Sequence, residues 1–143
     1  MVRPIEILLA DDSYEDIELT QEALNWNGIS SILHTVENGE ECLLFLRKMG
    51  RYADVPAPDI LLLDLNMPKK GGREVLNEIK SDKDLMHIPV IVLTTSKAEN
   101  DIIECYNNHA NCFITKPVDF DSFVAVVREI EQFWFKTVKL PNS

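Results

Sequence analysis

Five short, uninterrupted apolar runs alternate with stretches of helical periodicity, and this alternation constrains the fold more than any other feature. The runs are Ile5–Ala10, Ser31–Val36, Asp59–Leu63, Pro89–Leu93 and Asn111–Ile114. Strands that are apolar at nearly every position are buried on both faces, as in a parallel sheet covered by helices. The helical windows are Glu15–Asn27, Glu40–Met49, Arg73–Ser81, Glu99–Asn108 and Phe120 to about Phe135. The pattern predicts an α/β domain, a doubly wound five-stranded parallel sheet with five helices.

Composition agrees with a single globular domain. The chain has 143 residues, of which 45% are hydrophobic and 27% charged, enough length and apolar content for a buried core. Its formal net charge is −10. Binding to a nucleic-acid backbone requires Lys and Arg to displace counterions, so we expect no nucleic-acid partner.

No segment predicts export or membrane insertion. The N-terminus lacks an apolar stretch leading to a cleavage site, and no apolar run approaches the roughly 18 residues of a membrane span. Cys42, Cys105 and Cys112 include no CxxC pair, so we expect buried or half-buried thiols in a reducing compartment. The expected location is the cytoplasm, with no membrane contact.

Polar side chains of related chemistry follow four of the apolar runs. Asp11 and Asp12 follow the first run, Asp64 the third, Thr94 the fourth and Lys116 the fifth. The carboxyl ends of parallel strands form the ligand-binding edge of an open sheet, so these groups are expected to meet there. One Asp or Thr after a strand is usually a helix cap, and it is the joint occurrence at four strand ends that indicates a site. Three carboxylates, a hydroxyl and an ammonium suit a divalent cation and a phosphoryl group.

With these residues in place, positions 4–135 resemble the receiver domains of bacterial two-component response regulators. The segment Asp64-Leu65-Asn66-Met67-Pro68 is similar to the one around that family's phosphoacceptor. The resemblance implies the flavodoxin-like receiver fold with strand order 2-1-3-4-5. The segments most similar to stand-alone regulators paired with bacterial phytochromes are Gly39–Leu46, Arg51–Pro58, Arg73–Ser81 and Phe133-Trp134-Phe135.

The resemblance also implies a reaction and a cofactor. Asp64 would accept a phosphoryl group from a sensor histidine kinase, which in this subfamily is a phytochrome, and form an acyl phosphate. Asp12 and Asp64 would bind Mg²⁺ directly, and Asp11 would bind it through water. The backbone carbonyl of Asn66 would be a further ligand. Lys116 would stabilise the phosphoryl oxygens. Beyond its own phosphorylation and dephosphorylation, the chain is expected to catalyse nothing.

A conformational switch is implied as well. Thr94 would hydrogen-bond the phosphate and move inward, and Phe113, at the family's switch-aromatic position, would rotate from exposed to buried. The bond between Lys116 and Pro117 resembles one that is cis in the family, which would aim the Lys side chain into the site.

Two further positions and one departure from the family pattern concern the site loops. Asn66 and Ser96 would flank the path of an attacking water and tune the lifetime of the phosphorylated state. Gly71 stands before Gly72 where the family often has Asp-Gly, so the helix that follows is expected to begin without a side-chain cap.

The expected organisation is a receiver domain over residues 1–135, a short tail over 136–143 and no output domain, so that signalling depends on contact with a downstream protein that the sequence does not identify. In the last helix one stripe is expected to face the core, comprising Phe120, Phe123, Val127, Ile130 and Trp134. Three further apolar side chains lie off this stripe: Val126, Phe133 and Phe135. Their position predicts a homodimer interface that also includes the fourth helix and the fifth strand. Lys69, Lys70 and Arg73 either dock an acidic kinase surface or form a solvated loop.

Three alternatives remain open. A receiver-like adaptor independent of phosphorylation would have the same fold. A small haloacid-dehalogenase-type phosphatase also uses an Asp nucleophile after a strand, but requires a second Asp where Asn66 stands. A flavodoxin-like flavin or nucleotide binder would need a Gly-rich phosphate loop after the first strand, where Asp11 and Asp12 stand instead.

Overall fold

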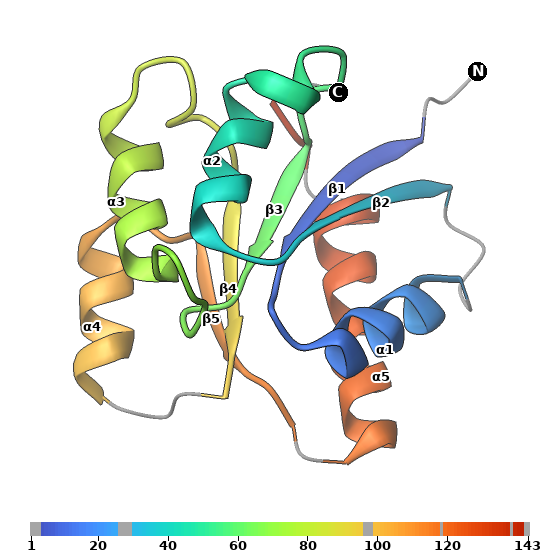
Figure 1. Ribbon diagram of the computed structural model, residues 1–143. Helices are drawn as coiled ribbons and strands as arrows, with labels where there is room; N and C mark the ends of the chain where they lie inside the picture. The colour runs from blue at the N-terminus through green and yellow to red at the C-terminus, as the bar shows by residue number, and fades with distance from the viewer. Residues whose placement is uncertain (1–3, 26–29, 96–98, 118, 138, 142–143) are drawn as a thin grey trace.

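The five expected strands form one parallel sheet in the order β2-β1-β3-β4-β5 (Figure 1). The structure is a computed structural model, which describes residues 4–25, 30–95, 99–117, 119–137 and 139–141. The strands are β1 Ile5–Ala10, β2 Ser31–Val36, β3 Ile60–Leu63, β4 Val90–Thr94 and β5 Cys112–Thr115. Each bound lies within one residue of the sequence prediction, and the predicted fold class and strand order are confirmed.

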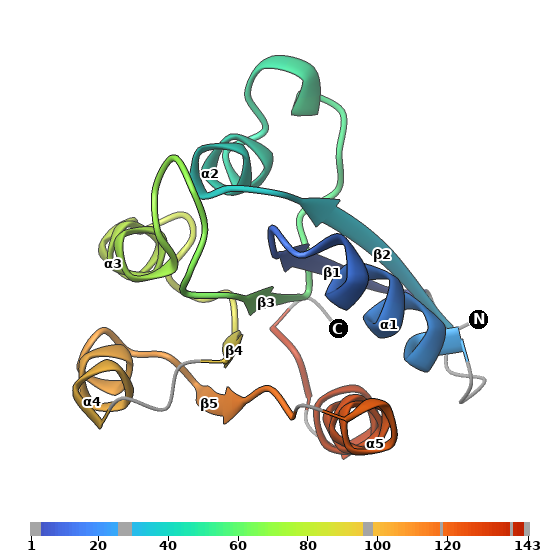
Figure 2. The same cartoon turned by 60° about the horizontal axis from the view of Figure 1, so that its bottom comes forward.

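Five α-helices cover the two faces of the sheet: α1 Tyr14–Asn25, α2 Gly39–Leu46, α3 Gly72–Ser81, α4 Glu99–Asn107 and α5 Phe120–Ile130. Figure 2 shows α1 and α5 on one face and α2, α3 and α4 on the other. A short 3-10 helix, Gly50–Tyr52, lies in the connection to β3. Among the described residues we find no helix with both the length and the apolar character needed to cross a bilayer.

The sheet is buried on both sides, as its apolar runs predict. All four residues of β3 are buried, and they divide between two core clusters. Leu61 and Leu63 face the layer of α2 and α3, whereas Ile60 and Leu62 face that of α1 and α5. Each such side chain stabilises the fold by about 1.5–3 kcal/mol when fully removed from water. The sheet is therefore a rigid support for whatever lies at its edge.

The end of the chain departs from the predicted single helix. The α-helix stops at Ile130, and the chain continues as a π-helix, Glu131–Thr137. Of the predicted core stripe, Phe123, Val127 and Ile130 are buried, and Trp134 packs against the same core.

One expectation for this region is wrong. Phe120 is 48% exposed, because it is the first residue of α5 and that end of the helix extends past the strands (Figure 1). Leu140, in the expected tail, is only 3% exposed. The Leu140 side chain therefore packs against the domain.

Two close backbone contacts fix the loop between β3 and α3. A Cβ atom on Gly72 would lie 2.3 Å from the carbonyl oxygen of Asp64, and one on Gly39 would lie 2.1 Å from that of Lys70. The Gly72 N–H donates to the Leu65 carbonyl at 2.9 Å. Gly71 is the N-cap of α3 and makes no side-chain capping bond, as predicted. The loop is held between the starts of α2 and α3, with Asp64 at its beginning.

We expect Gly72→Ala to lower the free energy of unfolding by about 2 kcal/mol, since overpacking against fixed backbone costs about 1–3 kcal/mol. Urea denaturation monitored by circular dichroism measures the change. Gly71→Ser is the matched control, because a Cβ there meets only the Leu65 carbonyl at 3.4 Å and Ser is a good N-cap. Equal stability of the Gly72 variant and wild type would contradict the close contact.

Candidate functional site

The ends of four neighbouring strands bring the predicted site residues to one edge, which faces the viewer in Figure 2. Ala10 pairs with Leu63, so the residues that follow β1 and β3 lie level with each other. Beyond the strand ends the backbone pairing continues, because the Asp64 N–H donates to the Ala10 carbonyl at 2.9 Å. On the other side, the Lys116 N–H donates to the Thr94 carbonyl at 2.7 Å. These bonds fix the backbone from which the polar side chains project.

The ammonium group of Lys116 is the centre of the site. Its side chain is 4% exposed, and its Nζ lies 2.6 Å from Asp11 Oδ2, 2.8 Å from Asp16 Oδ2 and 3.4 Å from Asp64 Oδ2. A buried charge is tolerated when it is paired and hydrogen-bonded, and here three carboxylates surround it. The approach of Lys116 to Asp11 and Asp64 agrees with the sequence prediction.

Two details of this network differ from expectation. The described residues contain no cis peptide bond, so the bond between Lys116 and Pro117 is trans. The Lys116 side chain reaches the site with this trans bond. Asp16 is not among the predicted site residues; it lies in the first turn of α1, where an acidic side chain favours the helix dipole. Sequence spacing could not place its carboxylate on Lys116, which is 100 residues away.

Electrostatics of the pair Asp11 and Lys116 follow from burial and hydrogen bonding. Burial raises the pKa of Asp11 to about 6, although hydrogen bonds from Lys116 and from the Ser13 N–H oppose the rise. Burial disfavours the Lys116 ammonium, but its hydrogen bonds to Asp11 and Asp16 outweigh that effect and hold the pKa of Lys116 above its ordinary value. The lysine is therefore permanently charged, whereas Asp11 changes charge in weak acid.

Three carboxylates can hold a cation here. Oxygen atoms of Asp11, Asp12 and Asp64 all lie within 4.8 Å of one another. A ligand set made only of carboxylate oxygens fits a hard divalent cation. Asp12 is exposed while the other two are buried, so an ion would lie at the mouth of the cluster, where water or phosphate oxygens can complete its coordination. Asn66 is exposed, and its N–H donates to Asp64 Oδ1 at 3.3 Å.

The predicted switch residues Thr94 and Phe113 lie on the neighbouring strands β4 and β5. Thr94, the last residue of β4, is fully buried. Phe113 is half-buried and packs against the core cluster on the side of α2 and α3. Its N–H donates to the hydroxyl of Tyr106 on α4 at 3.2 Å, a contact that no sequence pattern indicated. Ser96 lies outside the described residues.

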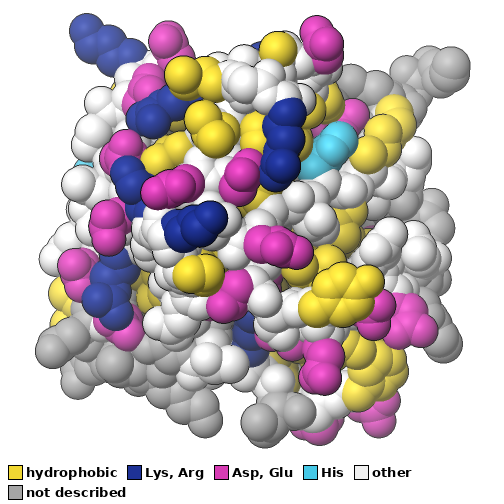
Figure 3. Space-filling view, in the orientation of Figure 1, with side chains coloured by type: hydrophobic (Ala, Val, Ile, Leu, Met, Phe, Trp, Pro, Cys, Tyr) yellow, Lys and Arg dark blue, Asp and Glu magenta, His cyan; other side chains and the backbone are white. Residues whose placement is uncertain are grey.

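Two of the three basic residues that follow Asp64, Lys70 and Arg73, are paired with carboxylates of the same chain. Lys70 pairs with Glu78 on α3. Arg73 pairs with Asp101 and Glu104 on α4, the latter at 3.7 Å. On the face drawn in Figure 3, Lys and Arg side chains are interspersed with Asp and Glu. These pairings favour a structural role for Lys70 and Arg73 over a free basic surface for a kinase.

The chain is similar to known proteins along nearly its whole length. A family model of the response regulator receiver domain matches residues 7–128. The response regulator Rcp1 of Synechocystis sp. is 46% identical over 140 residues, 98% of this chain and 95% of that protein.

Two solved structures are similar in fold as well as in sequence. A crystal structure of the phosphorylated cyanobacterial phytochrome response regulator RcpA has a TM-score of 0.94 at 47% identity, covering 97% of this chain and 99% of that one. The Mn²⁺-bound form of Rcp1 has a TM-score of 0.93 at 46% identity, covering 96% and 99%.

The raised pKa of Asp11 predicts a pH dependence of stability in the absence of divalent ions. Between the ordinary Asp pKa of 3.8 and the raised pKa of about 6, the folded chain holds a proton that the unfolded chain releases. The stabilisation is thus complete below the lower value and is lost as pH rises through the upper one. We expect unfolding free energy to fall by about 2 kcal/mol across this window relative to Asp11→Asn.

Urea denaturation with EDTA between pH 4 and pH 6.5 measures this difference. Asp54→Asn, which removes an exposed carboxylate, is the control and should follow the wild-type curve. Parallel pH profiles for wild type and Asp11→Asn would contradict the role of Asp11.

Proposed function

The chain belongs to the response regulator receiver family, and on that premise we propose that Asp64 accepts a phosphoryl group from a sensor histidine kinase in a magnesium-dependent reaction. The observation that carries the proposal is the buried Lys116 ammonium, 3.4 Å from the Asp64 carboxylate and beside three carboxylates able to hold a cation. The similarity to RcpA, described as a phytochrome response regulator, supports a phytochrome as the kinase.

The proposed reaction is nucleophilic catalysis by a carboxylate. An Asp64 oxygen attacks the phosphorus of a phosphohistidine, the P–N bond breaks as the P–O bond forms, and the imidazole leaves. Lys116 balances charge on the phosphoryl oxygens throughout.

The metal would occupy the acidic cluster. Asp12 and Asp64 would hold Mg²⁺ directly, Asp11 through water and Asn66 by its backbone carbonyl. The existence of a Mn²⁺-bound form of the similar protein Rcp1 supports a divalent ion as the cofactor. When bound, the ion supplies charge neutralisation for the phosphoryl oxygens. Apart from forming and hydrolysing its own acyl phosphate, the chain is proposed to have no enzymatic activity.

Signalling would pass from the phosphate to the surface of β5. Thr94 is placed at the end of β4 beside the site, and its hydroxyl would bind a phosphoryl oxygen. Phe113 is half-buried, which is compatible with a shift to a fully buried rotamer. Asn66 and Ser96 would set the lifetime of the acyl phosphate by controlling the approach of water.

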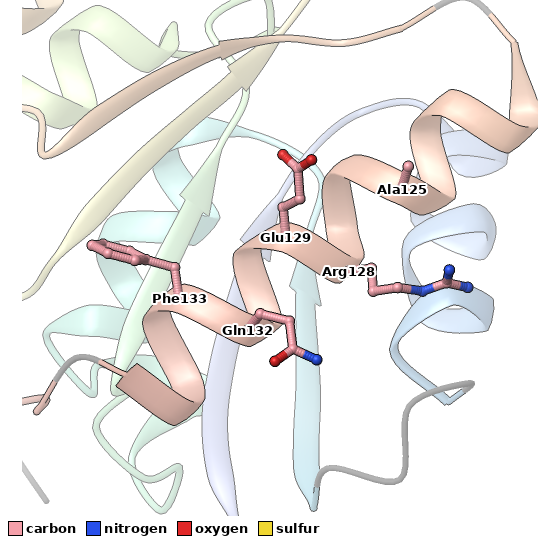
Figure 4. A pocket seen from close by; sticks show the side chains of 5 residues that line it. All are labelled: Ala125, Arg128, Glu129, Gln132 and Phe133. Atoms are coloured by element: carbon pink, nitrogen blue, oxygen red, sulfur yellow. The ribbon is translucent and has the colours of Figure 1, made fainter.

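Output is proposed to be through protein contact, with residues 1–135 as the receiver domain, 136–143 as its tail and the cytoplasm as the location. Phe133 packs against Trp134 in a T-shaped arrangement, with the two ring centroids 5.7 Å apart. Phe133 is nevertheless 55% exposed, and this exposure supports it as part of a homodimer surface. Figure 4 shows the side chains around an adjoining pocket, Ala125, Arg128, Glu129, Gln132 and Phe133. Val126 packs partly against the core, and the side chain of Phe135 lies outside the described part of the chain.

We expect incubation with acetyl phosphate and Mg²⁺ to add one phosphoryl group to wild type and none to Asp64→Asn, as measured by intact mass. Omitting Mg²⁺ should abolish the adduct, because the clustered carboxylates repel an anionic donor. Asp54→Asn is the matched control. No adduct on the folded wild type would favour the phosphorylation-independent adaptor. Continuous release of phosphate from added esters would favour a phosphatase.

Replacing Phe133 by Asp should shift the chain toward monomer in light scattering, because a charge in an apolar interface is costly to desolvate. Met49→Asp is the control, since Met49 is 53% exposed on a different part of the surface. Identical masses for wild type and Phe133→Asp would count against the proposed dimer.

A further inference from the structure

The Lys116 ammonium has a carboxylate partner, Asp16, that is neither an expected cation ligand nor the expected phosphoacceptor. Asp16 Oδ2 lies 2.8 Å from Nζ, closer than Asp64 Oδ2 at 3.4 Å. Asp16 is 25% exposed at its side chain, whereas Lys116 is 4% exposed. The contact therefore joins the start of α1 to the end of β5.

The position of Asp16 is fixed by its own backbone. Its N–H donates to the Ser13 hydroxyl at 3.3 Å, and its carbonyl accepts from the hydroxyl of Thr20 at 2.8 Å. Thr20 is buried. Ser13 is in turn bound to the site, because its N–H donates to Asp11 Oδ1 at 2.9 Å. Asp11 and Asp16 are thus two fixed acceptors on one short segment.

A lysine ammonium is tetrahedral and has three N–H donors. Two of them are used in short bonds to fixed acceptors, Asp11 and Asp16, and this sets the direction of the third. Asp64 Oδ2 lies at 3.4 Å, longer than a charge-assisted hydrogen bond of about 2.7–2.9 Å. The third donor is consequently available to a phosphoryl oxygen on Asp64.

We propose that Asp16 is a positioning residue for phosphoryl transfer, which holds the Lys116 ammonium so that one N–H faces the incoming phosphoryl group. The inference rests on the proposed function. Without Asp16, two acceptors remain for three donors, and Nζ is free to close on Asp64 and occupy its nucleophilic oxygen. Preorganised donors stabilise a transition state because they need no rearrangement during the reaction.

A simpler role for Asp16 would be its charge at the positive end of the α1 dipole. Glu15 occupies the same first turn and is exposed, so it offers the same charge to the helix. The described part of the chain shows no ion pair between Glu15 and Lys116. Comparing the two residues separates the helix effect from the lysine effect. Glu15→Ala is therefore the matched control.

The test measures the rate of phosphorylation by acetyl phosphate at saturating Mg²⁺, from intact mass against time. We expect Asp16→Ala to lower the rate about tenfold, as loss of orientation in a reacting pair does. Asp16→Asn should recover most of the rate, because its amide oxygen accepts the same bond. Glu15→Ala should match wild type. In a Lys116→Ala background, Asp16→Ala should have no further effect, since the two residues act as one unit.

Titration with Mg²⁺, followed by calorimetry, separates positioning from metal binding. Asp16→Ala should keep nearly wild-type affinity, whereas Asp12→Ala should lose it. The proposal is overturned if Asp16→Ala keeps the wild-type phosphorylation rate, or if Glu15→Ala loses as much of that rate as Asp16→Ala does. It is also overturned if Asp16→Ala lowers the rate by the same factor whether residue 116 is Lys or Ala. A wild-type chain that takes no phosphoryl group overturns the proposed function, and this inference with it. A phosphorylated wild type with an unaffected Asp16→Ala overturns only the inference.

Discussion

The structure depends on one buried ammonium group at the carboxyl edge of the sheet. Lys116 contacts Asp11 and Asp16, which lie on one short segment, and the distant Asp64, and so joins the ends of β1, β3 and β5 with the start of α1. Burial raises the pKa of Asp11, and the carboxylates outnumber the ammonium, which creates an attraction for a divalent ion. The same group of buried side chains therefore joins the strand ends and provides the charge for a cation.

The backbone beneath this charge cluster is unusually close-packed for a loop region. Gly39 and Gly72 bring two helix starts against the carbonyls of the β3–α3 loop, where no Cβ fits. A nucleophilic carboxylate must be held within a fraction of an ångström of its working position. The buried sheet and the two glycine contacts supply that rigidity around Asp64.

The region beyond the site is connected by fewer and more polar contacts. Arg73, in the first turn of α3, pairs with Asp101 and Glu104 on α4, and Tyr106 of α4 bonds the backbone of Phe113 on β5. These contacts link the loop after Asp64 to the surface proposed to carry the signal. Ion pairs and single hydrogen bonds exchange more easily than a packed core.

The sequence by itself determined the fold class, the bounds of the strands and the set of residues at the sheet edge, because apolar runs and strand ends are local patterns. It also determined the family, since Asp64, Thr94 and Lys116 each follow a strand at a characteristic place. Only the tertiary structure decided the partner of Asp16, the Tyr106 contact and the burial of Leu140. Asp11 and Asp16 are 105 and 100 residues from Lys116, and pairing over such separations depends on how the helices pack on the sheet, which no local pattern encodes.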